Sequence, residues 1–241
     1  MSIRVLLSFF VIFLLTATGT ALSGQCPAVL QNTNRLVLVT APDMSREQVT
    51  MHLFVRDARK SAWRSVGRPR QIVIGRAGMA WGHTYRTVAK PGEPIKREGD
   101  KRTPAGFFKI GASFGFERSS RPGHVVLRKD ETICVDDVRS TAYNTVQSRA
   151  AIGPKASGEN MRAYAIYRHG LFVGYPSSRK SKAGSCIFLH LMTKSGRGTH
   201  GCLAMPEMTL LGLQLFTEPG AVLGVLPLAA LNRFSGCVPA Q

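Results

Sequence analysis

The sequence predicts a mostly β protein, because short apolar runs and apolar–polar alternation recur along most of its length, whereas only one stretch has clear helical spacing. Hydrophobic residues make up 44% of the 241 residues, which is enough for an ordinary core and gives no sign of general disorder. No internal repeat or low-complexity segment interrupts this pattern. The expected strands are residues 36–40, 51–56, 71–75, 106–110, 124–127, 163–167, 171–175, 186–191 and 221–225.

A helix is expected over residues 206–216, "PEMTLLGLQLF". A proline and an acid stand in its first turn, and a Pro-Gly pair follows its end. Met208, Leu211 and Leu215 recur at helical spacing and form its expected apolar stripe. Between the strands expected at 163–167 and 171–175, His169 and Gly170 are expected to make a hairpin turn.

Residues 1–25 have the organisation of a signal peptide, with Arg4, an apolar run over 5–15 and then small residues. The apolar run is well short of the roughly 20 residues that a membrane-spanning helix needs, so an uncleaved anchor is the lesser alternative. We therefore expect an exported protein of the periplasm or cell envelope, with one domain over 26–241 and no transmembrane segment after cleavage.

The formal net charge is +18, and loss of Arg4 would lower it by one. Outside the cytoplasm a strongly basic protein is expected to meet anionic envelope polymers or peptidoglycan stem peptides rather than nucleic acid. The basic residues are scattered along the chain, so a solvated basic surface that aids solubility is the alternative.

Five cysteines follow the signal segment, and an odd number in an oxidising compartment leaves at least one without an internal partner. Cys26 and Cys237 lie at opposite ends of the mature chain, and chain ends are often close in space, so a disulfide between them is plausible. Cys134 and Cys186 stand in apolar, strand-like text and could pair or be buried thiols.

Cys202 follows His200 and Gly201 and lies 12 residues after His190, at the end of an expected strand. A thiol is a strong nucleophile only as a thiolate, so catalysis needs a nearby base, and His190 could provide it. Gly201 would let the backbone turn so that nearby amides face an oxyanion. The alternatives are a disulfide or buried thiol at Cys202, or a metal bound by His190, His200 and Cys202; no fourth ligand is evident, and no metal or other cofactor is expected.

Two segments, "EGDKRTPAGFFKIG" (98–111) and "GSCIFLHLMTKSGRGTHGCLAM" (184–205), resemble the paired signatures of the L,D-transpeptidase catalytic domain of the YkuD type. "CVDDVRSTAYN" (134–144) is similar to an exported branch of that family. The resemblance covers most of the mature chain. It implies a β-sandwich or barrel with a short helix after the catalytic cysteine, and a role in cell-wall biogenesis and cell shape.

By this resemblance Cys202 is the nucleophile and His190 the general base, while Thr199, His200 and Gly201 shape the motif loop and bind the oxyanion. The implied reaction forms a thioester with a tetrapeptide stem and transfers it to an amine. A hydrolase on the same fold and a non-catalytic peptidoglycan-binding module are the alternatives. Ala204 replaces an arginine that the family usually carries, and the His-to-Cys interval is shorter, which puts substrate positioning in doubt. The candidates for substrate binding are Lys96, Arg97, Arg102, Asp136, Tyr143 and Asn144.

Overall fold

The structure is a computed structural model that describes residues 26–217 and 220–239. The expected signal peptide, residues 1–25, therefore lies outside the described residues. None of the helices in the described ranges combines the length and hydropathy needed to cross a bilayer.

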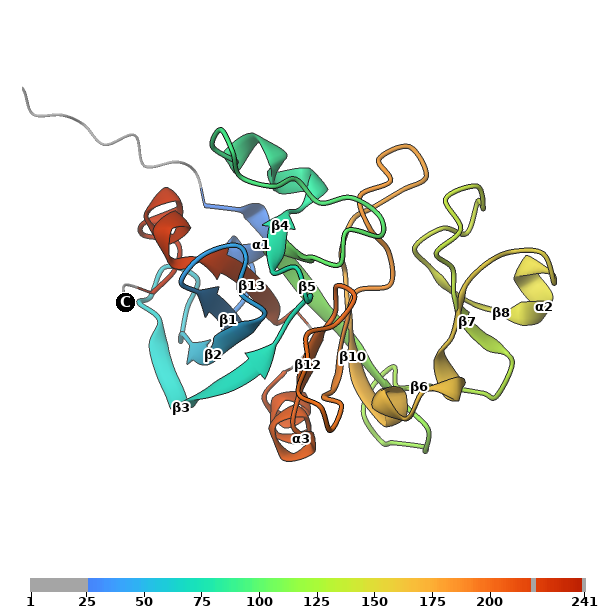
Figure 1. Cartoon of the computed structure of the whole chain (residues 1–241). Helices are drawn as coiled ribbons and strands as arrows, with labels where there is room; N and C mark the ends of the chain where they lie inside the picture. Colours follow the sequence, from blue (N-terminus) through green and yellow to red (C-terminus); the bar gives the residue numbers. More distant parts are fainter. Residues whose placement is uncertain (1–25, 218–219, 240–241) are drawn as a thin grey trace, which may run out of the picture.

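The main body of the molecule is a closed β-barrel, as expected for the mostly β class (Figure 1). Neighbouring strands pair in the order β10-β11-β12-β3-β2-β1-β13-β5, and β5 pairs in turn with β10, which closes the ring. The strands are β1 (Arg35–Ala41), β2 (Gln48–Val55), β3 (Arg64–Val73), β5 (Thr103–Gly115), β10 (His169–Val173), β11 (Phe188–Leu191), β12 (Leu203–Met205) and β13 (Val222–Pro227).

The centre of the barrel wall is β1 paired in parallel with β13, where Leu36 lies opposite Val222. Residues 36–39 of β1 and all of β13 are buried, so neither strand shows alternation. Such continuous apolar runs are typical of strands covered on both faces, which is why the sequence identified both.

A second, smaller sheet lies beside the barrel (Figure 1, the labels β7, β8 and α2). Its strand order is β8-β7-β9. These strands are too short for a periodic signal, and the sequence did not identify them. The further elements are α1 (Ala28–Gln31), β4 (Met79–Trp81), η1 (His83–Val88), β6 (Val125–Val126), β7 (Thr132–Cys134), β8 (Val146–Ser148), α2 (Arg149–Ile152), β9 (Glu159–Asn160) and η4 (Leu228–Phe234).

The prediction of a strand at 163–167 is wrong. The chain there forms two 3-10 helices, η2 (Met161–Ala163) and η3 (Ala165–Arg168). His169 and Gly170 do not make a hairpin turn but begin β10. A Cβ at position 170 would overlap the ring of Phe114, so this glycine permits close packing against a neighbouring side chain rather than a reversal of the chain.

Helix α3 (Glu207–Phe216) confirms the expected helix, but the expected stripe is wrong. Met208 and Leu215 are 79% and 80% exposed, whereas Leu210, Leu213 and Phe216 are buried. The helix carries apolar residues on all of its sides, so spacing alone could not select the buried face. Gln214 helps to fix the rotation, because its Nε2 donates to the Gly170 carbonyl at 3.0 Å.

Four of the five cysteines form two disulfides, Cys26–Cys237 and Cys134–Cys186. The first joins the two ends of the mature chain, as expected. The second joins β7 of the small sheet to the segment that enters β11. Cys202 is free and buried, so the hypothesis that a disulfide locks it is wrong.

Replacement of both Cys26 and Cys237 by serine is expected to lower the free energy of unfolding by about 5 kcal/mol, because the bridge closes a loop of 211 residues in the unfolded chain. Denaturant unfolding of the oxidised proteins measures this. The matched control removes the Cys134–Cys186 bridge, whose sequence separation of 52 predicts a smaller loss. A loss below about 1 kcal/mol at the terminal bridge would contradict the prediction.

Candidate active site

The loop that presents Cys202 is held by side-chain hydroxyl groups. Thr199 Oγ1 accepts from the Gly201 amide at 3.0 Å and donates to the Cys202 carbonyl at 2.6 Å. From β5, Thr103 Oγ1 donates to the Gly201 carbonyl at 2.8 Å. Gly201 has φ of +146°, and a Cβ there would crowd Ile187 and the Arg102 carbonyl. The THGC turn is therefore fixed, and position 201 requires glycine.

The hydrogen bond of the Gly201 amide has a consequence for the expected oxyanion site. Because this N–H already donates to Thr199 Oγ1, it is not free to bind a developing oxyanion. The Cys202 amide and the amides around it are the remaining backbone candidates.

The Cys202 thiol lies against backbone groups of the segment that leads into β11. The residue is 8% exposed, Phe188 N donates to Sγ at 3.3 Å, and Sγ donates to the Cys186 carbonyl at 3.2 Å. Burial, with a smaller effect from the charge of Glu159, raises the thiol pKa to about 12. At neutral pH Cys202 is therefore protonated and needs a base to become a nucleophile.

His190 is placed on β11, directly beside the strand that follows Cys202. It pairs with Ala204 of β12, and Cys202 lies two residues before Ala204, in the bend that leads into β12. His190 Nδ1 lies 2.8 Å from the Leu191 carbonyl, and because a carbonyl only accepts, Nδ1 carries the proton and Nε2 is free to accept one. His190 is 4% exposed, and burial lowers its pKa to about 4, so the ring is neutral at pH 7.

Both side chains line one cleft of about 720 Å³. Thr199, His200 and Gly201 line it too, and the His200 side chain is exposed there. The hydrogen bonds of Cys202 Sγ go to Phe188 and Cys186 rather than to His190. The structure therefore brings the expected nucleophile and base into one cleft, with the thiol turned toward the backbone. Elsewhere in the cleft are Glu98, Lys101, Asp136, Glu159, Tyr164, Tyr167 and Arg197.

Tyr167 and Glu159 are cleft residues that sequence reasoning missed. The Tyr167 hydroxyl donates to Glu159 Oε2 at 2.8 Å, and the Tyr167 ring meets the His190 ring edge-on with centroids 5.3 Å apart. Burial raises the pKa of both groups, and the Tyr167 hydroxyl also acts on Cys202, whose pKa it lowers slightly. Nothing in "AIYRHG" marks this tyrosine, because its partners come from β9, β11 and the THGC loop.

Replacement of Tyr167 by phenylalanine is expected to slow alkylation of Cys202 by iodoacetamide about threefold at fixed pH, because the Tyr167 hydroxyl lowers the pKa of the Cys202 thiol and the variant lacks it. The rate is measured by intact mass over time. Tyr164→Phe is the matched control, since Tyr164 also lines the cleft but is half-exposed. Equal slowing in both variants would contradict a specific role for the Tyr167 hydroxyl.

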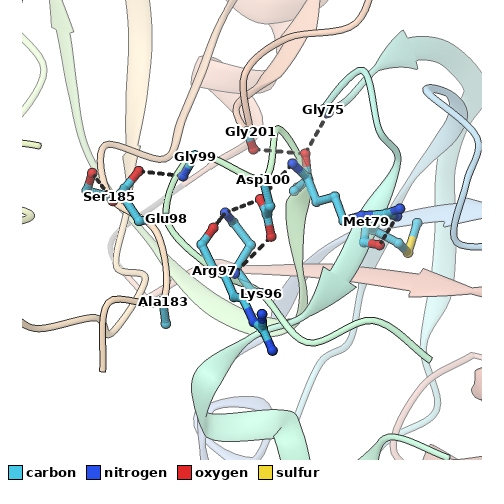
Figure 2. Close-up of polar contacts among 12 residues, drawn as sticks. Gly75, Met79, Lys96, Arg97, Glu98, Gly99, Asp100, Ala183, Ser185 and Gly201 are labelled. Carbon is cyan, nitrogen blue, oxygen red and sulfur yellow. Dashed lines mark hydrogen bonds and ion pairs between the residues drawn. The ribbon is translucent and has the colours of Figure 1, made fainter. Parts of the chain in front are cut away.

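Five of the six expected substrate-binding residues lie outside the cleft lining, and three of these five are cations. The Lys96 side chain is 2% exposed, and its Nζ donates to Asp100 Oδ1 and to the Arg97 carbonyl, each at 2.6 Å (Figure 2). Arg102 Nη1 donates to the carbonyls of Met44 and Met79. Arg97 is exposed away from the lining. The sequence shows these cations but not the buried ion pair and carbonyls that already hold Lys96 and Arg102.

Of the other three candidates, only Asp136 lines the cleft, and Tyr143 and Asn144 lie outside its lining. Asp136 accepts from Ser157 Oγ at 2.7 Å. The buried Tyr143 donates its hydroxyl to Glu98, whose carboxylate turns toward Ser185 in Figure 2.

Asn144 acts on the nucleophile through the backbone. Its Oδ1 accepts from the Cys186 amide at 3.1 Å, and its Nδ2 donates to the Tyr175 carbonyl at 2.9 Å. The Cys186 carbonyl in turn accepts from the Cys202 thiol. Asn144 therefore fixes the segment against which the thiol rests. Within the described residues, no group of three or more His, Cys, Asp or Glu side chains is arranged to hold a metal ion.

A scan against protein-family models found no match, and a search of curated proteins found no relative. Among solved structures, the chain is similar to the helical cell shape determining protein Pgp2 of Campylobacter jejuni, at 15% identity and a TM-score of 0.41 over 80% of this chain and 48% of that one. It is similar to an Enterococcus faecium L,D-transpeptidase, at 11% identity and a TM-score of 0.34 over 80% and 50%. A further likeness is to L,D-transpeptidase 3 of Mycobacterium tuberculosis, at 12% identity and a TM-score of 0.34 over 80% and 61%. The chain spans about half the length of the first of these structures.

Proposed function

We propose that this protein is a cysteine acyltransferase of peptidoglycan, with Cys202 as nucleophile and His190 as general base. One observation carries the proposal. A free thiol in the bend before β12 and a neutral imidazole on the neighbouring strand β11 line the same cleft, in a chain whose other cysteines are all disulfide-bonded. The TPxGxFxI and THGC motifs supply the substrate class, a peptidoglycan tetrapeptide stem.

In the first step the Cys202 side chain leaves the Cys186 carbonyl and Sγ transfers its proton to His190 Nε2. Sγ then attacks the carbonyl that joins the L-centre of the diamino acid to the terminal D-residue. The tetrahedral intermediate collapses with cleavage of the C–N bond. The leaving amine takes the proton from His190, and an acyl-enzyme thioester remains.

In the second step an amine of a neighbouring stem attacks the thioester and gives its proton to His190, which restores the thiol through protonation of Sγ. Water in place of the amine makes the same site a hydrolase. With a pKa of about 4, His190 is unprotonated before each attack and holds the thiol proton only briefly.

The cellular setting belongs to the same proposal. Residues 1–25 act as a signal peptide, and 26–241 form the catalytic domain in the periplasm or cell envelope. The two disulfides support an oxidising compartment, because such bonds are rare in the reducing cytosol.

Intact mass measurement of the purified, oxidised protein after incubation with a disaccharide-tetrapeptide tests the proposal. The expected result is one adduct with the mass of the substrate less its terminal D-residue, which peptide mapping locates at Cys202. Analysis of the released products then separates cross-linked dimers from hydrolysed tripeptides. Absence of any adduct, in protein whose Cys202 is a free thiol on denaturation, would overturn the proposal and favour the binding module.

A further inference from the structure

Most of the charges that line the cleft come from two parts of the fold; Glu98, from the same loop as Lys101, is the exception, and its carboxylate accepts from Tyr143, Ser185 and the Gly99 amide. Asp136 follows β7 and Glu159 belongs to β9, so both come from the small sheet, and the charge of Asp136 helps to raise the pKa of Glu159. Lys101 and Arg197 come from two other loops, which pack against the segment that follows β3. The small sheet therefore contributes two acids to the cleft lining and the two loops contribute two cations, and Cys202 lines the same cleft.

The backbone of the two loops that carry these cations is firmly anchored. The Lys101 carbonyl accepts from the Ala77 amide at 3.1 Å, and Thr199 exchanges backbone hydrogen bonds with Ile74 and Arg76 at 2.8 and 2.9 Å. Gly75 and Gly198 permit this packing, because a Cβ at either position would overlap backbone atoms of the facing loop. Lys101 and Arg197 thus extend from fixed backbone positions.

Their charged ends are available to a ligand. In residues 26–217 and 220–239, neither Lys101 nor Arg197 forms an ion pair with a carboxylate. The nearby acids are engaged elsewhere: Asp100 binds Lys96, and Glu47 accepts from the Gly198 amide. Lys101 also helps to lower the pKa of His200, after burial and Arg76, so its positive potential reaches the motif loop.

We propose that Lys101 and Arg197 form a carboxylate-binding site in the cleft, and that Asp136 and Glu159 of the small sheet repel the same carboxylate. The ligand class is a peptide with a free carboxylate near its scissile bond; the identity of that peptide rests on the proposed function, whereas the anion site does not. This site also compensates for Ala204, which is buried and pairs with His190 where the resembled family carries an arginine.

The test compares a negatively charged and a neutral reagent at the same thiol. Iodoacetate and iodoacetamide both alkylate Cys202, and the ratio of their rates reports the local potential without any peptide substrate. Lys101→Gln combined with Arg197→Gln is expected to lower the iodoacetate-to-iodoacetamide ratio about threefold, and added salt should lower the wild-type ratio in the same direction.

Arg118→Gln combined with Lys129→Gln is the charge-matched control, because both residues are exposed and outside the cleft. The control is expected to keep the wild-type ratio, and all three proteins should unfold at the same temperature. An unchanged ratio in the cleft variant, or an equal fall in the control, would overturn the anion site.

A second measurement separates this site from the proposed function. The rate of adduct formation is compared for a tetrapeptide with free carboxylates and for its amidated form. The cleft variant is expected to lose about threefold with the first and little with the second. A lowered alkylation ratio with no peptide adduct in any protein would keep the anion site and overturn the acyltransferase. Adduct formation at equal rates in the cleft variant and the wild type would keep the acyltransferase and overturn the anion site.

Discussion

Replacement of Cys202 by serine is expected to lower the rate of acyl-enzyme formation by about four orders of magnitude, because the neutral hydroxyl is a far weaker nucleophile and a far weaker acid than the thiol. The loss should appear as an absent adduct by mass under conditions in which the wild type is fully modified. A stable adduct at another residue of the variant would show that the cleft binds substrate but that the nucleophile is misassigned.

The serine variant is also a test of specificity, because it should fold as the wild type does. A hydroxyl can accept from the Phe188 amide and donate to the Cys186 carbonyl, as the thiol does. Both disulfides are independent of Cys202. Thermal unfolding of the oxidised variant within a few degrees of the wild type would exclude misfolding as the reason for lost activity.

Replacement of His190 by glutamine is expected to lower the acylation rate about 10³-fold, since a positioned base contributes roughly 10² to 10⁴ and glutamine cannot accept the thiol proton. In the wild type, acylation should stay level from neutral pH down toward pH 4, the pKa of the buried imidazole, and then fall as His190 becomes protonated. The variant should lose this acid limb, and its rate should rise with pH as the thiolate forms toward pH 12. An acid limb near pH 6.5 would contradict the buried neutral imidazole.

The same shift predicts how stability depends on pH. His190 binds a proton in the unfolded chain below about pH 6.5 but in the folded protein only near pH 4, so the wild type should lose up to about 3 kcal/mol as the pH falls between these values. The glutamine variant should lack this contribution. Denaturant unfolding of both proteins at pH 7.5 and pH 4.5 makes the comparison.

The sequence identified those parts of the fold whose signal is local. The leucine and valine runs of β1 and β13 predict buried strands, and the prolines and the glycine at its two ends predict the limits of α3. The face of α3 could not be predicted, because it depends on Gln214 reaching Gly170 of β10. Closure of the barrel by β5 and β10 and the pairing of β7 with β9 likewise depend on contacts between distant residues.

In the candidate site too, only the residues with a local sequence signal could be predicted. His190 precedes Cys202 of the THGC turn by only 12 residues, and both belong to one motif-bearing segment, so the sequence predicted them as one site. Tyr167 and Glu159 join them only through tertiary packing. At Lys96 the sequence predicted a substrate-binding cation, but this side chain is buried and already paired with Asp100.

The burial of the Cys202 thiol has a consequence for the lifetime of the protein in an oxidising environment. The thiolate is the form that attacks peroxides and disulfides, and a thiol whose pKa is about 12 is almost entirely un-ionised at neutral pH. The folded protein should therefore resist peroxide and oxidised glutathione much longer than a peptide cysteine does. While the chain is still unfolded, the same thiol competes for the partners of Cys134 and Cys186, so the vulnerable interval is folding itself and ends when the cleft closes around the sulfur.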